Sequence, residues 1–364
     1  MSKPHTFLAP FAQRIWQRKG LISTLLLPFS WLVLLAVLIK RHRHTHSAAY
    51  PTHGVPVIVV GNLMTGGTGK TPVVIALVNT LKALGRRPGI ISRGYGVTLN
   101  RLEARVGKGT LDPALYGDEP ALIAQATGAP VAVHPRRCLA LQRLVETYPD
   151  VDIVVSDDGL QHLALARDIE IAVQDERGLG NERLLPAGPL REPPSRLKTV
   201  DLIVLHQSGP TPEEGSEPDT QGAAHLRATG VSRVRMRLQP VSCTQISTGE
   251  VQPWAQWAKR HRGESLGAVA AIGQPQRFFG LLRQHGLNPD PAIALPDHAA
   301  DIASVVQQVK QPVVLVTDKD AVKLQGTPDT RVWSVQVAPR FSDPHWVQAL
   351  LKRLQSNATP GQNE

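Results

Sequence analysis

Residues 55–84 read VPVIVVGNLMTGGTGKTPVVIALVNTLKAL: a short β-branched run, a glycine-rich turn, and apolar residues that recur at helical spacing. This order predicts a strand, a loop and a helix. In such a unit the backbone N–H groups of the turn point at phosphate oxygens, and the positive end of the helix lies behind them. We therefore expect a nucleotide phosphate to bind at the loop, which consists of Thr65, Gly66, Gly67, Thr68, Gly69, Lys70 and Thr71.

Two residues of this loop have distinct expected tasks. Lys70 would reach the β- and γ-phosphates of ATP, and Thr71 would offer its hydroxyl to Mg²⁺. The strict pattern G-x-x-x-x-G-K-[ST] is not met, because its first glycine falls on Met64. The T-G-G-T-G-K-T sequence is instead close to the variant of P-loop ATPases of the partition and maturation type. A chance glycine turn is the alternative, but the flanking strand and helix disfavour it.

Further short apolar runs alternate with helical patterns along the chain. Such alternation indicates a mostly parallel sheet with helices on both faces, an α/β fold of the P-loop NTPase type. The expected strands are residues 89–92, 131–134, 151–156, 169–173 and 202–205, and the expected helices include residues 120–126 and 137–148.

A second, smaller α/β lobe is expected after a polar segment, residues 209–222, that is rich in Pro, Gly and acid. Residues 231–238 and 241–246 have the pattern of an antiparallel strand pair, and strands are expected at 266–272, 313–317 and 332–337. The predicted organisation is a membrane-associated segment, a nucleotide-binding core, a linker with a hairpin, the smaller lobe and a disordered tail, at residues 1–50, 51–208, 209–264, 265–356 and 357–364.

Acidic residues stand where ligands of open α/β sheets bind. Asp157 and Asp158 follow the strand at 151–156, as in a Walker B strand, and hard carboxylate oxygens suit Mg²⁺. Asp118 and Glu119 begin the helix near Pro120, where Asp118 could accept the proton of a substrate hydroxyl and Glu119 could contribute to the metal site. The alternatives are a simple Asp-Gly turn for the first pair and helix capping for the second.

Two other polar residues follow predicted strands. Arg93 lies in the segment SRGYG after residues 89–92, where it could stabilise a transferring phosphate or grip an anionic substrate. His298 follows Asp297, and residues alone leave it open whether it is catalytic or an ordinary surface or core histidine.

The charge of the chain is unevenly distributed. No Asp or Glu precedes Glu103, whereas the same stretch holds 13 of the 40 Lys and Arg residues. This asymmetry predicts that the N-terminal part faces phospholipid headgroups, nucleic acid or a phosphorylated substrate. The two cysteines, Cys138 and Cys243, lie far apart and indicate neither a disulfide framework nor a zinc site.

An uncharged apolar stretch, residues 21–39, lies between basic flanks. As a helix it would be about 28 Å long, close to the ~30 Å of a bilayer core. Because both flanks are basic, spanning and interfacial insertion stay open, with a buried core helix as the third interpretation. Pro28 would kink a spanning helix.

Taken in order, these motifs resemble those of tetraacyldisaccharide 4'-kinases, enzymes of lipid A biosynthesis in Gram-negative bacteria. The resemblance covers nearly the whole chain, through GNLMTGGTGKTP (61–72), SRGYG, GDEP, DDGLQH (157–162), LLPAGPLREP (184–193), PDH and TDKDAVK. Two positions depart from the family pattern: Ala299 stands where a second histidine is frequent, and Asp318 where glutamate is frequent.

The resemblance implies transfer of the ATP γ-phosphate to the 4'-hydroxyl of tetraacyldisaccharide 1-phosphate at the cytoplasmic face of the inner membrane. It implies that Asp118 is the base and His298 its partner, and that Thr71, Glu119, Asp157 and Asp158 are candidates for the Mg²⁺ site. Anionic lipids of the membrane surface are the expected partner; no nucleic-acid partner is expected, and the chain is expected to be a monomer.

Two other interpretations of the motifs stay open from the residues alone. The first is a P-loop ATPase or GTPase that uses hydrolysis as a switch, which would leave Asp118 and His298 without a task. The second is a membrane-bound nucleotide-binding scaffold without catalysis.

Overall fold

The computed structural model describes residues 15–46, 54–99, 102–208, 229–297, 299 and 301–357, of which 44–46 and 357 are described by their backbone alone. The predicted nucleotide-binding core at 51–208 is described apart from residues 51–53 and 100–101. The predicted linker at 209–222, residues 358–364 of the predicted tail and His298 lie outside the described residues, whereas Asn357, the first residue of that tail, ends α13.

Within the described part of the chain, a mixed sheet of thirteen strands runs through the molecule. Most neighbouring strands are parallel; the antiparallel pairs are β3 with β4, β13 with β8, and β8 with β9 (Val251–Pro253). The order across the sheet is β11 (Ala292–Ala294), β10 (Leu266–Ala270), β12 (Val313–Thr317), β13 (Val332–Phe341), β8 (Arg233–Gln245), β7 (Leu202–His206), β6 (Ile169–Asp175), β1 (Val57–Gly61), β5 (Ile153–Asp157), β2 (Pro88–Ser92), β4 (Val131–Val133) and β3 (Arg105–Gly107).

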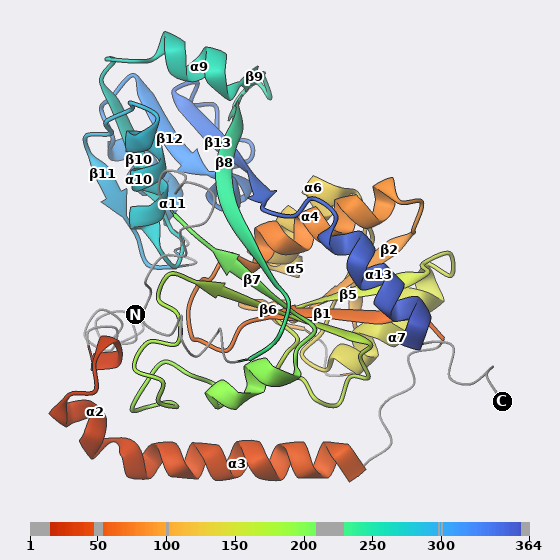
Figure 1. Ribbon diagram of the computed structural model, residues 1–364. Coiled ribbons are helices and arrows are strands. Elements are labelled where there is room, and N and C mark those ends of the chain that lie inside the picture. The colour runs from red at the N-terminus through yellow and green to blue at the C-terminus, as the bar shows by residue number, and fades with distance from the viewer. Residues whose placement is uncertain are drawn as a thin grey trace.

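The sheet has two halves, which Figure 1 separates into a lower half with β1–β7 and an upper half with β9–β12; β8 and β13 belong to both. The helices of the lower half are α4 (Lys70–Ala83), α5 (Pro113–Tyr116), α6 (Asp118–Thr127), α7 (Arg137–Thr147) and α13 (Trp346–Asn357), with the 3₁₀ turn η1 (Pro194–Thr199). Those of the upper half are α9 (Trp254–Arg260), α10 (Pro275–Gln284), α11 (Ile302–Gln308) and α12 (Asp318–Ala321), with the 3₁₀ turn η2 (Val322–Leu324).

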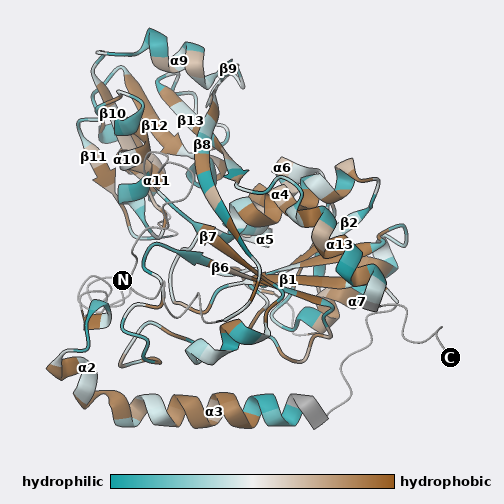
Figure 2. Cartoon of the chain, in the orientation of Figure 1, coloured by the Kyte–Doolittle hydropathy of each residue, from teal (hydrophilic) through white to brown (hydrophobic). Residues whose placement is uncertain are grey.

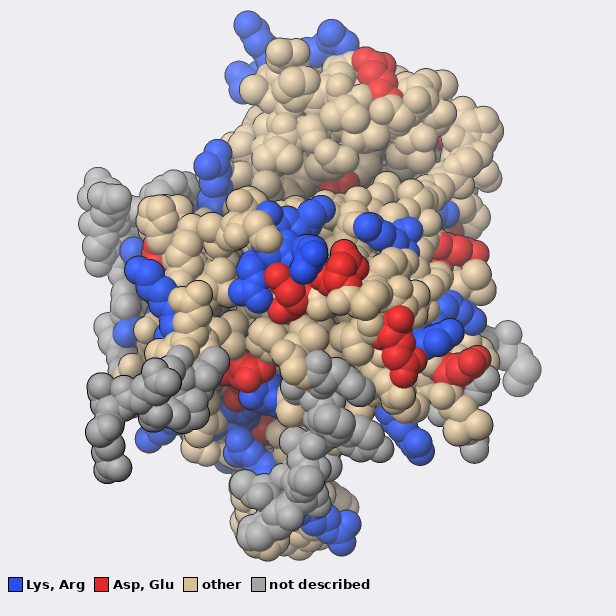
Figure 3. Space-filling model, turned by 90° about the vertical axis from the view of Figure 1, so that its right-hand side faces the viewer, with Lys and Arg blue, Asp and Glu red and all other residues tan. Residues whose placement is uncertain are grey.

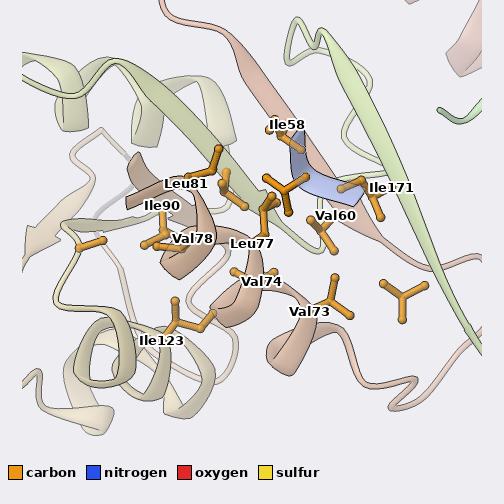
Figure 4. Close-up of a cluster of buried hydrophobic side chains, with 14 of the residues drawn as sticks. Ile58, Val60, Val73, Val74, Leu77, Val78, Leu81, Ile90, Ile123 and Ile171 are labelled. Atoms are coloured by element: carbon orange, nitrogen blue, oxygen red, sulfur yellow. The ribbon is translucent and has the colours of Figure 1, made fainter. Parts of the chain in front are cut away.

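The central strand β1 shows why this sequence forms a covered parallel sheet. Alternate side chains of a strand point to opposite faces. Ile58 and Val60 belong to the buried cluster that includes residues of α4 and α6 (Figure 4), whereas Val57 and Val59 belong to the cluster on the other face, with residues of α7. Both faces are buried, so β1 has an unbroken apolar sequence rather than an alternating one. The predicted parallel sheet with helices on both faces is confirmed.

The predicted hairpin at residues 231–246 is wrong, because these residues form one continuous strand, β8. Its first residues pair in parallel with β7, and its longer part pairs antiparallel with β13. Pro240 does not end the strand, because a bulge lies directly beside it: Gln336 pairs with Ser242 and Val337 with Pro240, so Val241 is an extra residue of β8. A bulge of this kind accommodates a residue that has no N–H to donate.

The N-terminal apolar stretch forms two helices, α2 (Leu21–Leu25) and α3 (Leu27–His46), rather than one. The buried hydroxyls of Ser23 and Ser30 donate to the carbonyls of Ala187 and Leu184, at 2.6 and 2.8 Å. Pro28 lies in the first turn of α3, where a helix does not need its N–H. Figure 2 shows the hydrophobic residues of α3.

Much of this apolar surface faces solvent, so the interpretation as a buried core helix is wrong. Leu21, Leu25, Trp31 and Leu32 are 86, 76, 64 and 64% exposed. Among the described residues, no helix combines the length and the apolar character needed to cross a membrane.

One face of the lower half carries mixed charge. In Figure 3, which shows the right-hand side of the view in Figure 1, Lys and Arg side chains are interleaved with Asp and Glu. This agrees with the sequence from Glu103 onward, where 27 bases stand against 30 acids.

Candidate active site

A cavity of about 730 Å³ opens at the carboxyl ends of β1, β2 and β5. It brings together four segments predicted from the sequence: the glycine-rich loop, SRGYG, GDEP and DDGLQH. Its lining residues are Lys40, Gly66, Gly67, Lys70, Ser92, Arg93, Tyr95, Asp118, Glu119, Pro120, Pro135, Arg137, Asp157, Asp158, Gln161, His162, Arg191 and Asp297.

The glycine-rich loop has the conformation of a phosphate cradle. Gly66 and Gly69 have φ of +91° and +92°, values that only glycine adopts readily. Gly69 directly precedes α4, whose N-terminus has no side-chain cap and no acid in its first turn. Its N–H groups and the positive end of the helix dipole are therefore available for an anion. Thr65, Thr68 and Thr71 belong to the same loop and helix start, but they do not line this cavity.

A layer of polar side chains that the motifs did not predict supports the loop from behind. Arg177 donates to the Gly67 carbonyl at 3.0 Å, and the ring Nδ1 of His206 lies 3.1 Å from the Thr68 carbonyl. Burial, followed by the charge of Arg277, lowers the pKa of His206 to about 4. The ring is therefore neutral at neutral pH, with Nδ1 as the donor to the carbonyl.

Asp175 holds the two arginines of this layer. Its carboxylate bonds Arg177 at 2.7 Å and Arg277, from α10 in the upper half, at 3.2 Å. Burial would raise the pKa of Asp175, but the two arginines outweigh it and keep the pKa below its usual range. These residues belong to no motif, and the contact between Arg277 and Asp175 joins positions about a hundred residues apart, which explains why the sequence did not reveal them.

The two acids after β5 differ in their surroundings. Asp157 is buried, accepts from the Ser92 hydroxyl at 3.0 Å, and has a pKa raised to about 7 by burial and then by the nearby Glu119. Burial alone would raise the pKa of Asp158 too, but Lys70 and Arg191, each 3.4 Å from its carboxylate, hold it below the usual value. An Asp-Gly turn alone does not account for this burial and charge pairing.

The residues present are suited to Mg²⁺. One carboxylate oxygen each of Asp157 and Asp158 is buried without a hydrogen-bond partner among the described residues, although Lys70 forms an ion pair with that of Asp158. No group of three or more His, Cys, Asp or Glu side chains there is arranged to enclose a metal ion. Mg²⁺ is usually held by one or two carboxylates together with substrate phosphates and water, so this sparse set suits it.

Asp118 and Glu119 are the first two residues of α6 and both line the cavity. The capping residue is Gly117, with φ of +94°, so neither acid caps the helix. Each carboxylate instead meets a lysine of the upper half: Asp118 lies 2.8 Å from Lys323, and Glu119 lies 3.1 Å from Lys319.

Two predicted site residues remain, Arg93 and His298, and the structure describes only the first. Arg93 lines the cavity, as the sequence predicted. His298 is outside the described residues, although Asp297 next to it reaches the cavity.

The structure adds two cations to the expected set. Arg137 is buried and donates to the Asp157 carbonyl at 3.1 Å. Lys40, from α3, donates to the Gln161 carbonyl at 2.7 Å and so brings the N-terminal helix to the cavity. In the sequence Lys40 was only one of several basic residues beside an apolar stretch.

The fold and this cavity define the class of the protein, a P-loop kinase. The loop suits the phosphates of a nucleoside triphosphate. Acids after β5 and β11 and at the start of α6 line the same cavity, beside the loop.

Comparison with known proteins identifies the family within that class. The family model described as tetraacyldisaccharide-1-P 4'-kinase matches residues 22–355. Proteins named tetraacyldisaccharide 4'-kinase from Bordetella petrii and Bordetella parapertussis are each 49% identical, over 96 and 94% of this chain and 98 and 96% of theirs. The crystal structure of LpxK from Aquifex aeolicus in complex with ATP superposes with a TM-score of 0.74 at 26% identity, covering 92% of this chain and 99% of that one. The chain belongs to the tetraacyldisaccharide-1-P 4'-kinase family, which confirms the predicted family and enzyme class.

Proposed function

We propose that this chain transfers the γ-phosphate of ATP to the 4'-hydroxyl of tetraacyldisaccharide 1-phosphate, with Mg²⁺ as cofactor. The observation that carries the proposal is the cavity that holds Lys70, Asp118 and the Asp157–Asp158 pair together. A hydrolytic switch is disfavoured by family membership, and it would leave the acids of GDEP without a task.

Each residue has a role in this proposal. Asp118 accepts the proton of the acceptor hydroxyl as its oxygen bonds the γ-phosphorus and ADP leaves. Lys70 and Arg93 compensate the charge of the transferring group. Mg²⁺, held by the candidates Thr71, Glu119, Asp157 and Asp158, would neutralise further charge on the phosphates. His298 orients Asp118.

The proposed organisation follows the sequence segments. Residues 51–208 hold ATP, and residues 265–356 complete the cavity through Asp297. We propose that α2 and α3 lie in the membrane interface, where the exposed Leu21, Leu25 and Trp31 would enter the acyl region. Basic residues such as Arg18 and Arg43 would then face anionic headgroups at the cytoplasmic face of the inner membrane. The lipid acceptor would reach the cavity from the bilayer beside Lys40.

The experiment is a phosphorylation assay with radiolabelled ATP, Mg²⁺ and a tetraacylated disaccharide 1-phosphate in mixed micelles. We expect labelled lipid from the wild type, none from Lys70→Ala, and a kcat lowered by about 10²-fold or more with Asp118→Ala at little change in KM for ATP. Lys310→Ala, an exposed lysine far from the loop in sequence, is the control. Free phosphate without labelled lipid from the wild type would refute the kinase proposal and favour a hydrolytic switch.

A further inference from the structure

A short segment of the upper half, residues 317–323 (TDKDAVK), faces the acids of GDEP across the cavity. It follows β12 and contains α12 and the start of η2. The hydroxyl of Thr317 accepts from the Asp320 N–H, which caps α12. Lys319 and Lys323 stand four positions apart in this turn, a spacing that places two side chains on the same side of a helix.

Both lysines cross from the upper half to the lower half. The ammonium of Lys323 lies 2.8 Å from Oδ2 of Asp118 and donates to the Ala299 carbonyl at 3.0 Å. The ammonium of Lys319 lies 3.1 Å from Oε1 of Glu119 and 3.1 Å from Oδ1 of Asp297.

The pair of Lys323 and Asp118 is shielded from solvent, with side chains 14 and 13% exposed. Lys319 is also 14% exposed, whereas its partners Glu119 and Asp297 are 32 and 37% exposed. Exposed ion pairs fix a side chain only weakly, whereas removal of one partner from a shielded pair leaves an uncompensated charge. The two lysines therefore restrict where the acids of GDEP can lie.

The segment itself is anchored to the sheet of the upper half. The buried carboxylate of Asp320 accepts from the Ala271 N–H at 3.0 Å and from the Thr317 hydroxyl at 2.7 Å. The neighbouring carboxylate of Asp318 accepts from the Ser334 hydroxyl. The lysines are thus carried by a turn that is anchored to the end of β10 and to β12 and β13.

We propose that Lys319 and Lys323 are positioning residues that set the carboxylates of Glu119 and Asp118 for phosphoryl transfer only while the upper half is docked on the lower half. This proposal rests on the proposed function. Asp118 is the first residue of α6 and its carboxylate does not cap the helix, so side-chain contacts decide where the carboxylate lies. The contact with Lys323 restricts the position of Oδ2, and Lys319 links Glu119 to Asp297. A base misplaced by about 1 Å loses on the order of 10²-fold in rate.

The first test separates positioning from binding. In the full chain, Lys323→Met should lower kcat by roughly 10- to 100-fold while KM for ATP changes less than about threefold. Lys323→Arg, which keeps the cation, should recover most of the loss. Lys310→Met, at an exposed lysine of the upper half, is the control. A kcat within about twofold of the wild type in Lys323→Met, or equal losses in Lys323→Met and Lys323→Arg, would overturn the proposal.

The second test does not depend on lipid phosphorylation. Amide hydrogen exchange of the full chain should be at least about tenfold faster in α6 of the Lys319→Met/Lys323→Met variant than in the wild type, with α4 unchanged. Unchanged exchange in α6 would overturn the proposal, as would an equal rise in α4 and α6, which would indicate general destabilisation. If the wild type labels no lipid, the proposed function fails, whereas the exchange result still decides whether the lysines position the acids.

Discussion

Replacement of Gly69 by alanine tests the geometry of the phosphate cradle. Gly69 has φ of +92°, and a Cβ at this position would lie 2.5 Å from Nδ1 of His206. The imidazole has little room to withdraw, because it is buried and bonded to the Thr68 carbonyl. The loop must therefore leave its present conformation to accept the methyl group.

The size of the effect follows from two penalties. A left-handed backbone costs an alanine about 1–2 kcal/mol, and ATP must restore this conformation in order to bind. About 1.4 kcal/mol corresponds to a tenfold change in Kd, so the strain alone weakens ATP binding by about 5- to 30-fold. The clash with His206 adds to this penalty, and we expect a value at or above the upper end of that range.

Isothermal titration calorimetry with ATP and Mg²⁺ measures this Kd directly. Gly85→Ala is the matched control, because Gly85 has φ of +79° at the other end of α4 with no atom within 4 Å of an added Cβ. It should lower the melting temperature and leave the Kd for ATP unchanged. Wild-type affinity in Gly69→Ala would refute the cradle geometry, and an equal loss in both variants would trace the effect to global destabilisation.

Two further predictions concern pH and membrane binding. Because burial lowers the pKa of His206 to about 4, against about 6.5 in the unfolded chain, the neutral ring contributes stability above pH ~6.5 that is lost as pH falls toward 4. His206→Gln should therefore lose less melting temperature than the wild type between pH 7.5 and 5 in calorimetry, and an identical loss would contradict a buried neutral imidazole. Trp31→Glu and Leu35→Glu, at side chains 64 and 55% exposed, should each lower partition into anionic vesicles by about tenfold or more in a sedimentation assay. Val241→Glu, at an exposed valine of β8, should not change partition, and unchanged partition of Trp31→Glu would place attachment elsewhere.

The strongest local patterns predicted most of the lower half of the sheet. The apolar runs at 89–92, 131–134, 151–156, 169–173 and 202–205 correspond to β2, β4, β5, β6 and β7. A strand buried on both faces has an uninterrupted apolar sequence, which is easy to recognise. A glycine-rich turn between such a strand and a helix is typical of phosphate binding. Each of these patterns lies within a few consecutive residues, so it can be recognised without knowing how the rest of the chain folds.

The errors and omissions arose where distant residues decide the structure. The single strand β8 was predicted as two strands at 231–238 and 241–246, because the pairing with β13 that carries it past Pro240 involves residues about a hundred positions away. The support of the glycine-rich loop by His206 joins residues separated by 138 positions. Lys40 shows the same limit, since only the folding of α3 against the lower half brings it to the cavity. Residue type and local spacing do not predict such contacts between residues that are distant in the sequence.

The course of β8 and β13 determines how the two halves of the molecule can move. A loop between two bodies permits free rotation about a few bonds, but here the connection is a hydrogen-bonded ribbon that spans from Met236 opposite Phe341 to Gln245 opposite Trp333. Any change in the angle between the halves must twist this ribbon over its length, including the bulge beside Pro240. A hydrogen-bonded ribbon resists such twisting, so it favours one angle between the halves, the angle at which the lysines of the upper half meet the acids of GDEP.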